Sequence, residues 1–185
     1  MRVRDAMPQD APALAAIYGH HVLHGAGTFE ETPPSPEEMV RRQDAVRVLG
    51  LPYLVAEAEA PRSEGVLGFA YASAFRPRAA YRYTAEDSVY VAPGQQGRGI
   101  GRALVAEVVA RCESLGLRQL VAVIGDSGNE ASIGLHRSLG FELRGVMPAL
   151  GFKHGRWVDV VWMQKALNAG AAAPPSAAGL ELRGG

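Results

Sequence analysis

The feature that most constrains this chain is a glycine-rich segment in its middle, which joins a predicted strand to a predicted amphipathic helix. The strand is expected over residues 83–91 and ends at Pro93-Gly94. Gln96-Gly97-Arg98-Gly99-Ile100-Gly101 follows and opens a helix expected over residues 99–114. The first N–H groups of a helix have no partner within the helix, and glycines let a phosphate approach them closely. Together with the charge of Arg98, the segment predicts a diphosphate site.

The spacing and position of these glycines argue against two common kinds of diphosphate site, the Walker loop and the dinucleotide-binding fold. Neither Lys-Ser nor Lys-Thr follows them, so the segment is not a Walker loop. A dinucleotide-binding fold would place its glycines after a strand near the N-terminus, with an acidic residue about 20 positions further on. Here the loop follows several predicted strands instead. From the glycines alone, an ordinary turn between a strand and a helix remains an alternative.

The order of the predicted elements indicates one domain. Strands are expected at residues 2–6, 51–59, 65–75, 83–91 and 119–124, with a hairpin-type connection at 61–64 and a last hairpin at 141–152 and 156–165. Helices are expected from residue 10, from residue 35, over 99–114 and over 130–139. This predicts a single α/β domain of the α+β type over residues 1–168. Its mixed, mostly antiparallel sheet has about seven strands with helices on both faces. Residues 169–185, rich in Ala, Gly and Pro, are expected to be a disordered tail.

Charge and cysteine usage exclude several classes of function. Lys plus Arg and Asp plus Glu number 19 each, so the basic excess of a general nucleic-acid or membrane-surface binder is absent. No apolar run approaches the roughly 20 residues that span a bilayer, and the first five residues lack the apolar run of a signal peptide. The single cysteine, Cys112, permits no internal disulfide and indicates a reducing compartment. We therefore expect a cytoplasmic protein.

Two separated motifs resemble those of the GNAT acetyltransferases. Residues 96–101 fit the Q/R-x-x-G-x-G/A signature with which that family binds the pyrophosphate of coenzyme A. Asn129-Glu130-Ala131-Ser132, followed by His136-Arg137-Ser138-Leu139-Gly140-Phe141, fits the second signature, an Asn before a short helix that ends in Gly-Phe. The resemblance covers residues 2–167. It implies the GNAT fold and an N-acetyltransferase that uses acetyl-CoA as co-substrate and no metal.

Three further segments are similar to the phosphinothricin and methionine sulfoximine N-acetyltransferase branch of that family, at residues 84–91, 121–124 and 151–157. This similarity implies transfer of an acetyl group to the α-amino group of a small amino acid analogue. Another small amine, a protein N-terminus or a non-catalytic acetyl-CoA-binding module remain alternatives. A homodimer is expected, with Trp157 and Trp162 of the last hairpin as candidate contacts.

The resemblance also implies which residues hold the co-substrate. Exposed backbone of the strand before the loop is expected to pair with the pantetheine amides and the acetyl carbonyl, at Val89, Tyr90 and Val91. Asn129 is expected to contact coenzyme A and to cap its own helix. The loop residues expected at the diphosphate are Gln96, Gly97, Arg98, Gly99, Ile100, Gly101 and Arg102.

Acetyl transfer requires a neutral amine, and a free α-amino group has a pKa of about 8, so a base must take its proton. The resemblance assigns this role to Glu86, on the strand that leads into the loop; a solvated surface carboxylate is the alternative. His136 stands where many GNAT enzymes have a Tyr general acid. It is expected to donate a proton to the departing thiolate or to orient the co-substrate, and a structural histidine is the alternative.

The substrate site is expected around two arginines, Arg76 and Arg78, because guanidinium groups bind carboxylate, phosphinate or sulfoximine oxygens in pairs. They favour an anionic substrate over a polycation, although a solvated basic loop is the alternative. The resemblance adds Phe29, Glu30, Glu86, Asp87 and Ser88 as substrate residues. Cys112 fits an apolar helical face and is expected in the core. The adjacent pair His20-His21 is expected on a helix surface, without the partner spacing of a metal site.

Overall fold

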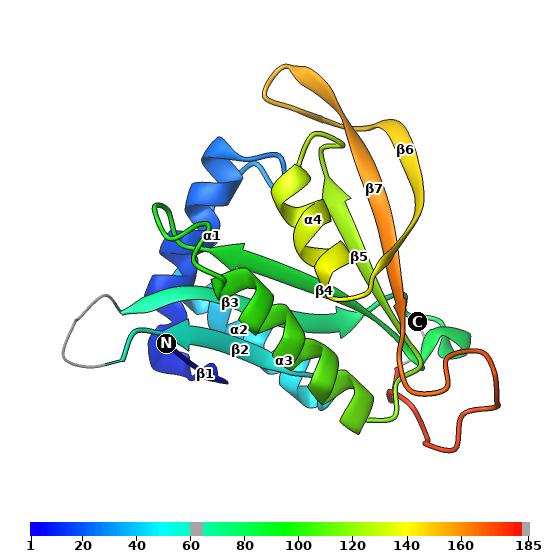
Figure 1. Cartoon of the computed structure of the whole chain (residues 1–185). Coiled ribbons are helices and arrows are strands. Elements are labelled where there is room, and N and C mark those ends of the chain that lie inside the picture. Colours follow the sequence, from blue (N-terminus) through cyan, green and yellow to red (C-terminus); the bar gives the residue numbers. More distant parts are fainter. Residues whose placement is uncertain (60–64, 183–185) are drawn as a thin grey trace.

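The computed structural model describes residues 1–59 and 65–182, so the connection expected at 61–64 lies outside the described residues. Within these residues, seven strands form one sheet in the order β1-β2-β3-β4-β5-β7-β6 (Figure 1). The strands are β1 (Arg2–Asp5), β2 (Tyr53–Glu57), β3 (Val66–Ala74), β4 (Thr84–Val91), β5 (Gln119–Gly125), β6 (Glu142–Lys153) and β7 (Arg156–Ala166).

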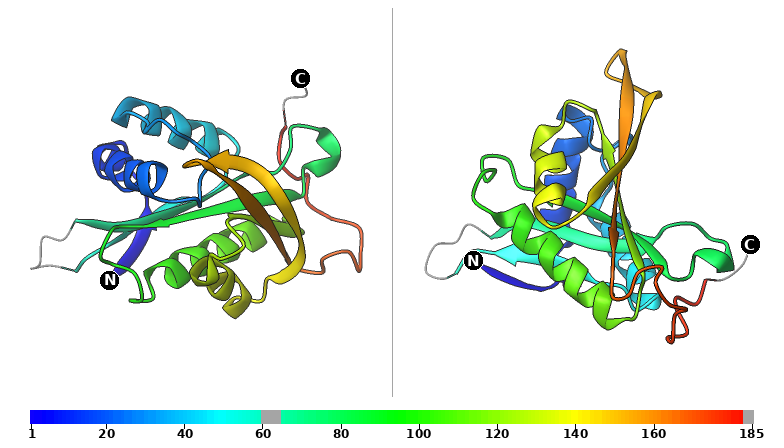
Figure 2. Two further views of the ribbon diagram at one scale, coloured as in Figure 1. Left: turned by 90° about the horizontal axis from the view of Figure 1, so that it is seen from above. Right: turned by 45° about the vertical axis from the view of Figure 1, so that its right-hand side comes forward.

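Helices cover both faces of this sheet. α1 (Ala11–His24) and α2 (Pro36–Val48) lie on one face, and α3 (Ile100–Ser114) and α4 (Glu130–Ser138) lie on the other (Figure 2). Two short 3-10 helices, η1 (Pro8–Asp10) and η2 (Ala79–Tyr81), complete the elements. The expected α/β fold is therefore confirmed, with a mixed, mostly antiparallel sheet. No helix in the described ranges is long and apolar enough to cross a membrane.

Local sequence signals account for the helices. Ser35 caps α2 as expected: its hydroxyl accepts the N–H of Glu38 at 3.3 Å, and Pro36 takes the first helical position. α3 turns an apolar stripe to the sheet, and its Leu104, Val105, Val108 and Cys112 have no exposed surface. Burial raises the pKa of Cys112 to about 12. The expected core position of Cys112 is confirmed by its complete burial, and with this pKa the thiol stays protonated at neutral pH.

β4 and β5 are the one parallel pair among the described strands, and they diverge after four residues. Their pairing runs from Thr84 with Gln119 to Asp87 with Ala122 and stops there. β4 stays paired to β3 as far as Val91, whereas β5 stays paired to β7 as far as Gly125. Because each strand follows its outer neighbour, the sheet opens between residues 88–91 and residues 123–125. Successive backbone groups of a strand alternate in direction, so N–H and C=O groups of β4 face this opening.

The segment after residue 168 differs from the expected disorder. Leu180 is 7% exposed, and its N–H donates to the Arg82 carbonyl at 2.8 Å. The Tyr83 hydroxyl donates to the Ala177 carbonyl at 2.9 Å, and Arg118 donates to the Ala173 carbonyl. Although its composition is poor in large apolar residues, this segment places a single leucine in the core cluster and adds backbone hydrogen bonds. Residues 169–182 therefore lie against the start of β4 (Figure 1).

Candidate active site

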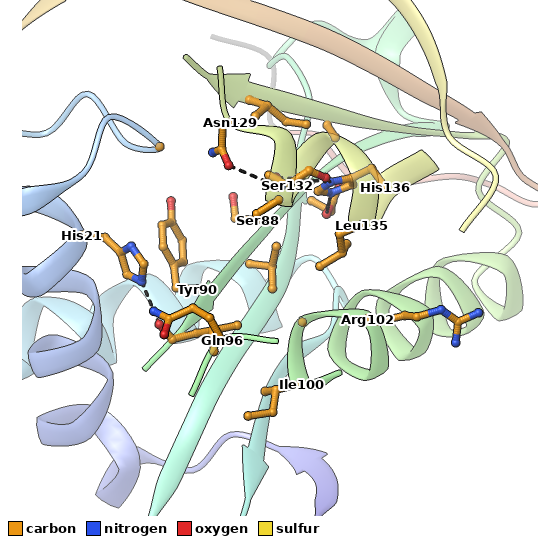
Figure 3. Close-up of a pocket in the computed structure, with 18 of the residues that line it drawn as sticks. His21, Ser88, Tyr90, Gln96, Ile100, Arg102, Asn129, Ser132, Leu135 and His136 are labelled. Atoms are coloured by element: carbon orange, nitrogen blue, oxygen red, sulfur yellow. Dashed lines mark hydrogen bonds and ion pairs between the residues drawn. The ribbon is translucent and has the colours of Figure 1, made fainter. Parts of the chain in front are cut away.

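A cavity of about 510 Å³ lies where the sheet opens. Its walls are β4 from Asp87 to Val91, β5 from Ala122 to Gly125, the glycine-rich loop and α4. Gln96 and Ile100 lie at one end of the site and Asn129, Ser132 and His136 at the other (Figure 3). The cavity thus connects the loop, where an anion is expected, with polar side chains of α4.

The loop has the backbone that an anion site needs. Gly97 and Gly99 have φ of 74° and 78°, in the left-handed region that other residues avoid. A Cβ at either glycine would meet no atom within 4 Å, so open space borders the first turn of α3. The free N–H groups of that turn fit a diphosphate. Gly101 has another role, because a Cβ there would lie 2.7 Å from Leu135 Cδ1 and would force the Leu135 side chain of α4 to shift.

The structure brings nearly all the residues expected at the co-substrate to this cavity. Arg98 is the exception: it is exposed, and its guanidinium donates to Gln95 Oε1. Asn129 caps α4 as expected, by accepting the Ser132 N–H at 3.2 Å, and it also lines the cavity. The expected residues that line the cavity are Val89, Tyr90, Val91, Gln96, Gly97, Gly99, Ile100, Gly101, Arg102 and Asn129.

Sequence reasoning missed several parts of the cavity wall, among them His21, the β5 residues and Ser132. His21 was expected on a helix surface, but it is half-buried and lines the cavity, with Nε2 2.9 Å from the Val91 carbonyl oxygen. Burial lowers the pKa of His21. The wall of β5 residues and Ser132 were also missed. For Ser132 a signal existed, because it follows the capping Asn129 by three positions and so lies in the first turn of the helix.

β4 sends two neighbouring carboxylates to opposite faces of the sheet. Glu86 shares a face with Tyr90, whose ring meets Tyr18 of α1 edge-on at a centroid distance of 4.8 Å. Glu86 is half-buried, and burial raises the pKa of its carboxyl, while the charge of Arg76 acts in the opposite direction. A carboxyl with a raised pKa is a stronger base than an exposed one. Glu86 does not line the cavity itself, but Ser88, two residues further along the same face, does.

Asp87 lies on the β4 face opposite Glu86, which differs from its expected place at the substrate. It was expected beside Glu86 at the substrate, yet its fully buried carboxylate faces α4, with Oδ2 3.0 Å from His136 Nε2. The His136 ring is also buried, and Nδ1 lies 2.7 Å from the Ser132 carbonyl oxygen. Burial by itself would lower the His136 pKa, but the hydrogen bond and the charge of Asp87 outweigh it, and the pKa is raised.

The two arginines expected at the substrate diverge. Arg76 lies over the Phe75 ring at 4.4 Å and over the Trp162 ring at 5.8 Å, close enough to Glu86 to influence its pKa. Arg78 is exposed and precedes η2. Only Arg76 of this pair is therefore placed to act together with Glu86.

The other expected substrate residues occupy the loop after α1. Glu30 accepts hydrogen bonds at 2.8 Å from Tyr18 and from Arg42, so its carboxylate is engaged within the protein. Phe29 is 42% exposed and packs on Gly151, where a Cβ would lie 2.4 Å from its ring. No group of three or more His, Cys, Asp or Glu able to hold a metal occurs among the residues that the structure describes.

The sheet opens beside a glycine-rich loop whose first helical N–H groups fit a diphosphate, and the strand that leads into this loop carries a half-buried carboxyl, Glu86, with a raised pKa. This arrangement is suited to acyl transfer. The chain belongs to the acetyltransferase (GNAT) family, whose model matches residues 21–141. The expected GNAT acetyltransferase with acetyl-CoA as co-substrate is thereby confirmed.

Relatives from three bacteria narrow the branch. The chain is 53% identical to phosphinothricin N-acetyltransferase of Alcaligenes faecalis, over 94% of this chain and 86% of the relative. It is 42% identical to L-methionine sulfoximine/L-methionine sulfone acetyltransferase of Pseudomonas paraeruginosa, over 93% and 98%. A phosphinothricin acetyltransferase from Sinorhizobium meliloti, solved in complex with AcCoA, superposes with a TM-score of 0.90 at 49% identity, over 96% of this chain and 94% of that one. The predicted branch is confirmed.

Proposed function

We propose that this enzyme acetylates the α-amino group of a small anionic amino acid analogue of the phosphinothricin and methionine sulfoximine class. The observation that carries the proposal is Glu86, a half-buried carboxyl with a raised pKa on the same β4 face as Ser88 and Tyr90, which line the cavity. Arg76 beside it supplies a positive charge for an anionic substrate. The substrates named for the relatives have this chemistry.

In this proposal β4 brings the two reactants together across the opening of the sheet. Glu86 takes a proton from the amine, which can then attack the acetyl carbon. Backbone groups of Val89 and Val91 hold the pantetheine arm and the acetyl carbonyl, as a strand pairs with a neighbour. The loop and Asn129 hold the rest of coenzyme A through N–H donors and the α3 dipole.

A screen of thiol release from acetyl-CoA tests the acceptor. We expect turnover with phosphinothricin, methionine sulfoximine and methionine sulfone that exceeds turnover with ordinary L-amino acids. Spermidine and a peptide with a free N-terminal alanine serve as controls, because neither matches a small anionic amine. Faster turnover of either control than of all three amino acid analogues contradicts the proposal.

Replacing Arg76 with Ala is expected to raise KM for phosphinothricin by roughly tenfold to a hundredfold, because a charge-assisted hydrogen bond contributes about 1.5–3 kcal/mol. KM for acetyl-CoA is expected to change little. Arg76→Lys should recover only part of the loss, since a point charge lacks the guanidinium fork. Arg78→Ala is the matched control, and its KM should stay within about threefold of wild type. Steady-state kinetics decide; equal effects of the two Ala variants speak against the assignment to Arg76.

We also infer that the enzyme is a homodimer joined through the β6–β7 hairpin, which extends beyond the rest of the sheet (Figure 1). Phe152 and Trp157 pack edge-on at 5.3 Å and are 58% and 64% exposed. Exposed apolar patches of this kind mark interfaces, and a second copy presents the same surface. The other large apolar residues exposed on β6 are Leu143, Val146, Met147 and Leu150.

Light scattering on Trp157→Asp tests this inference. The variant is expected to run as a monomer at concentrations where the wild type is a dimer, because a charge on the patch cannot be buried without cost. Leu115→Asp is the matched control, since Leu115 is 41% exposed at the end of α3. A monomeric wild type contradicts the inference.

We place the reaction in the cytoplasm. Cys112 is a free thiol, which agrees with a reducing compartment. The formal net charge of zero provides no overall attraction to nucleic acid or to anionic lipid. The partner of the site in this proposal is therefore a small-molecule amine.

A further inference from the structure

Both ring nitrogens of His136 face protein acceptors. Nδ1 lies 2.7 Å from the Ser132 carbonyl oxygen, and a carbonyl only accepts, so Nδ1 carries a hydrogen. Nε2 lies 3.0 Å from Asp87 Oδ2, which has no exposed surface. A second proton is therefore shared between the ring and the carboxylate. The ring cannot pass a proton to the cavity directly unless it first breaks one of these two bonds.

A third contact provides an indirect route. Ser132 Oγ lies 3.4 Å from His136 Nδ1, so the Nδ1–H has a hydroxyl as its second acceptor. Ser132 lines the cavity, in the first turn of α4 and between Asn129 and His136 (Figure 3). Asn129 accepts the Ser132 N–H and thereby fixes this turn. These contacts connect the buried carboxylate of Asp87, through the His136 ring, to the Ser132 hydroxyl at the cavity wall.

We propose that Asp87, His136 and Ser132 form a proton relay in which the Ser132 hydroxyl protonates the departing thiolate of coenzyme A. This inference rests on the proposed acetyl transfer and deepens it. Ser132 is then the catalytic residue that meets the sulfur, and His136 supplies its proton. Asp87 is a positioning residue, which acts by holding His136 in the doubly protonated form.

The relay balances protons and electrons. The lone pair of the neutral amine forms the N–C bond, and the C–S bond breaks with its electron pair moving to sulfur. Sulfur takes the Oγ proton of Ser132, and Ser132 takes the Nδ1 proton of His136. Glu86 passes to water first the ammonium proton that it removes before attack and then the proton that the acetylated nitrogen loses, and His136 regains one proton from water after the products leave. Each turnover therefore returns all four side chains to their initial state.

The surroundings of His136 define its protonation. On β4, the charge of Asp87 raises the pKa of His136 and also raises the pKa of Glu86 next to it. On α3, Cys112 lies close enough to Asp87 to be influenced by it, but its pKa of about 12 keeps it neutral. Phe141 packs edge-on against the ring at a centroid distance of 5.0 Å. The raised pKa shifts the His136 ring toward its doubly protonated form.

Kinetics of Ser132→Ala and Ser132→Thr test the last step of the relay. The Ala variant retains the backbone carbonyl that holds His136. We expect its kcat to fall about tenfold to a hundredfold, which is at or somewhat below the usual contribution of a general acid. Its Kd for acetyl-CoA should stay within twofold by calorimetry. Ser132→Thr retains a hydroxyl and should recover most of kcat. Ser114→Ala, a helical serine whose hydroxyl bonds within α3, is the control and should match wild type.

The pH dependence of Asp87→Asn tests the positioning role. The donor form of His136 is protonated, so kcat falls as pH rises through the His136 pKa. Without the carboxylate, burial dominates and lowers that pKa. The fall should therefore start at lower pH, and the variant should lose more activity at pH 8 than at pH 6.5. Nitrogen-15 NMR of His136, which needs no acceptor substrate, should show both ring nitrogens protonated at pH 7 in wild type and one in the variant.

These readouts separate the relay from the acceptor proposal. A wild type that acetylates none of the tested amino acid analogues contradicts the proposed function, and NMR then still tests the Asp87–His136 pair. An active wild type with a Ser132→Ala kcat within twofold of it overturns the relay. A wild-type ring with a single protonated nitrogen at pH 7, or an unchanged spectrum in Asp87→Asn, overturns the role of Asp87.

Discussion

Replacing Glu86 with Gln is expected to lower kcat by about a hundredfold or more, the usual scale for a general base, while calorimetry shows unchanged acetyl-CoA binding. The amide keeps the shape of the side chain but cannot take a proton. Glu86 lies outside the co-substrate cavity, so affinity for acetyl-CoA should not depend on its charge. A kcat within a fewfold of wild type at neutral pH contradicts the assignment.

The raised pKa of Glu86 adds a second readout. Burial raises the pKa above the ordinary carboxyl value, so the acid limb of kcat/KM should lie at higher pH than for a free carboxyl and should vanish in the Gln variant. A raised folded-state pKa means that the folded protein binds more protons than the unfolded chain, and stability falls as pH rises through that range. Glu86→Gln should therefore be more stable than wild type at pH 8, with a smaller difference at pH 4. Urea unfolding at both pH values measures this.

Kinetics and unfolding of Glu86→Gln together distinguish a half-buried general base from a solvated surface carboxylate. Replacing an exposed Glu changes neither the acid limb nor the free energy of unfolding by much. A loss of activity coupled to a gain in stability is expected only where function holds a charged group in an unfavourable, half-buried position. Arg76 relieves part of that penalty, since its charge lowers the Glu86 pKa.

Local signals explain why so much of this fold follows from its sequence. The cap at Ser35, the apolar stripe of α3 and the glycines of the loop act within a few residues, and the structure places each of them as expected. The opening of the sheet depends on pairing between distant strands. β5 turns away from β4 because it pairs with β7, which comes about 40 residues later. The β5 residues and His21 reach the cavity through that tertiary arrangement, so the sequence predicted the β5 strand but not its place in the cavity wall.

The structure differs from the prediction at two other places, Asp87 and the C-terminal segment. In both, the sequence held local information that the family resemblance or the average composition led us to overlook. Strand alternation alone puts Asp87 on the face opposite Glu86, although the resemblance grouped both at the substrate. In the C-terminal segment, the Ala, Gly and Pro content predicted disorder, yet Leu180 is buried beside Arg82 and Leu182 packs against the core. Two leucines and a few hydrogen bonds to residues 82, 83 and 118 contact the folded domain, and an average over the composition of the segment does not register them.

Replacing Gly99 with Val is expected to abolish measurable acetyl-CoA binding in a protein that still folds. Gly99 caps α3 with φ of 78°, and the space that its side chain would enter is empty of protein. That space lies at the N–H groups that would hold the diphosphate. Loss of two charge-assisted hydrogen bonds, at about 1.5–3 kcal/mol each, corresponds to a hundredfold or larger rise in Kd.

Gly94→Val is the control for this prediction, because it separates backbone strain from ligand binding. Gly94 has a similar φ of 76° and equally open surroundings, but it does not line the cavity. Both variants should lose stability by about 1–3 kcal/mol, the usual cost of a left-handed conformation in a residue other than glycine. Only Gly99→Val should lose acetyl-CoA, as measured by calorimetry on protein whose thermal unfolding remains cooperative. A folded Gly99→Val protein with wild-type affinity, or an equal loss of affinity in Gly94→Val, contradicts a diphosphate site at the start of α3.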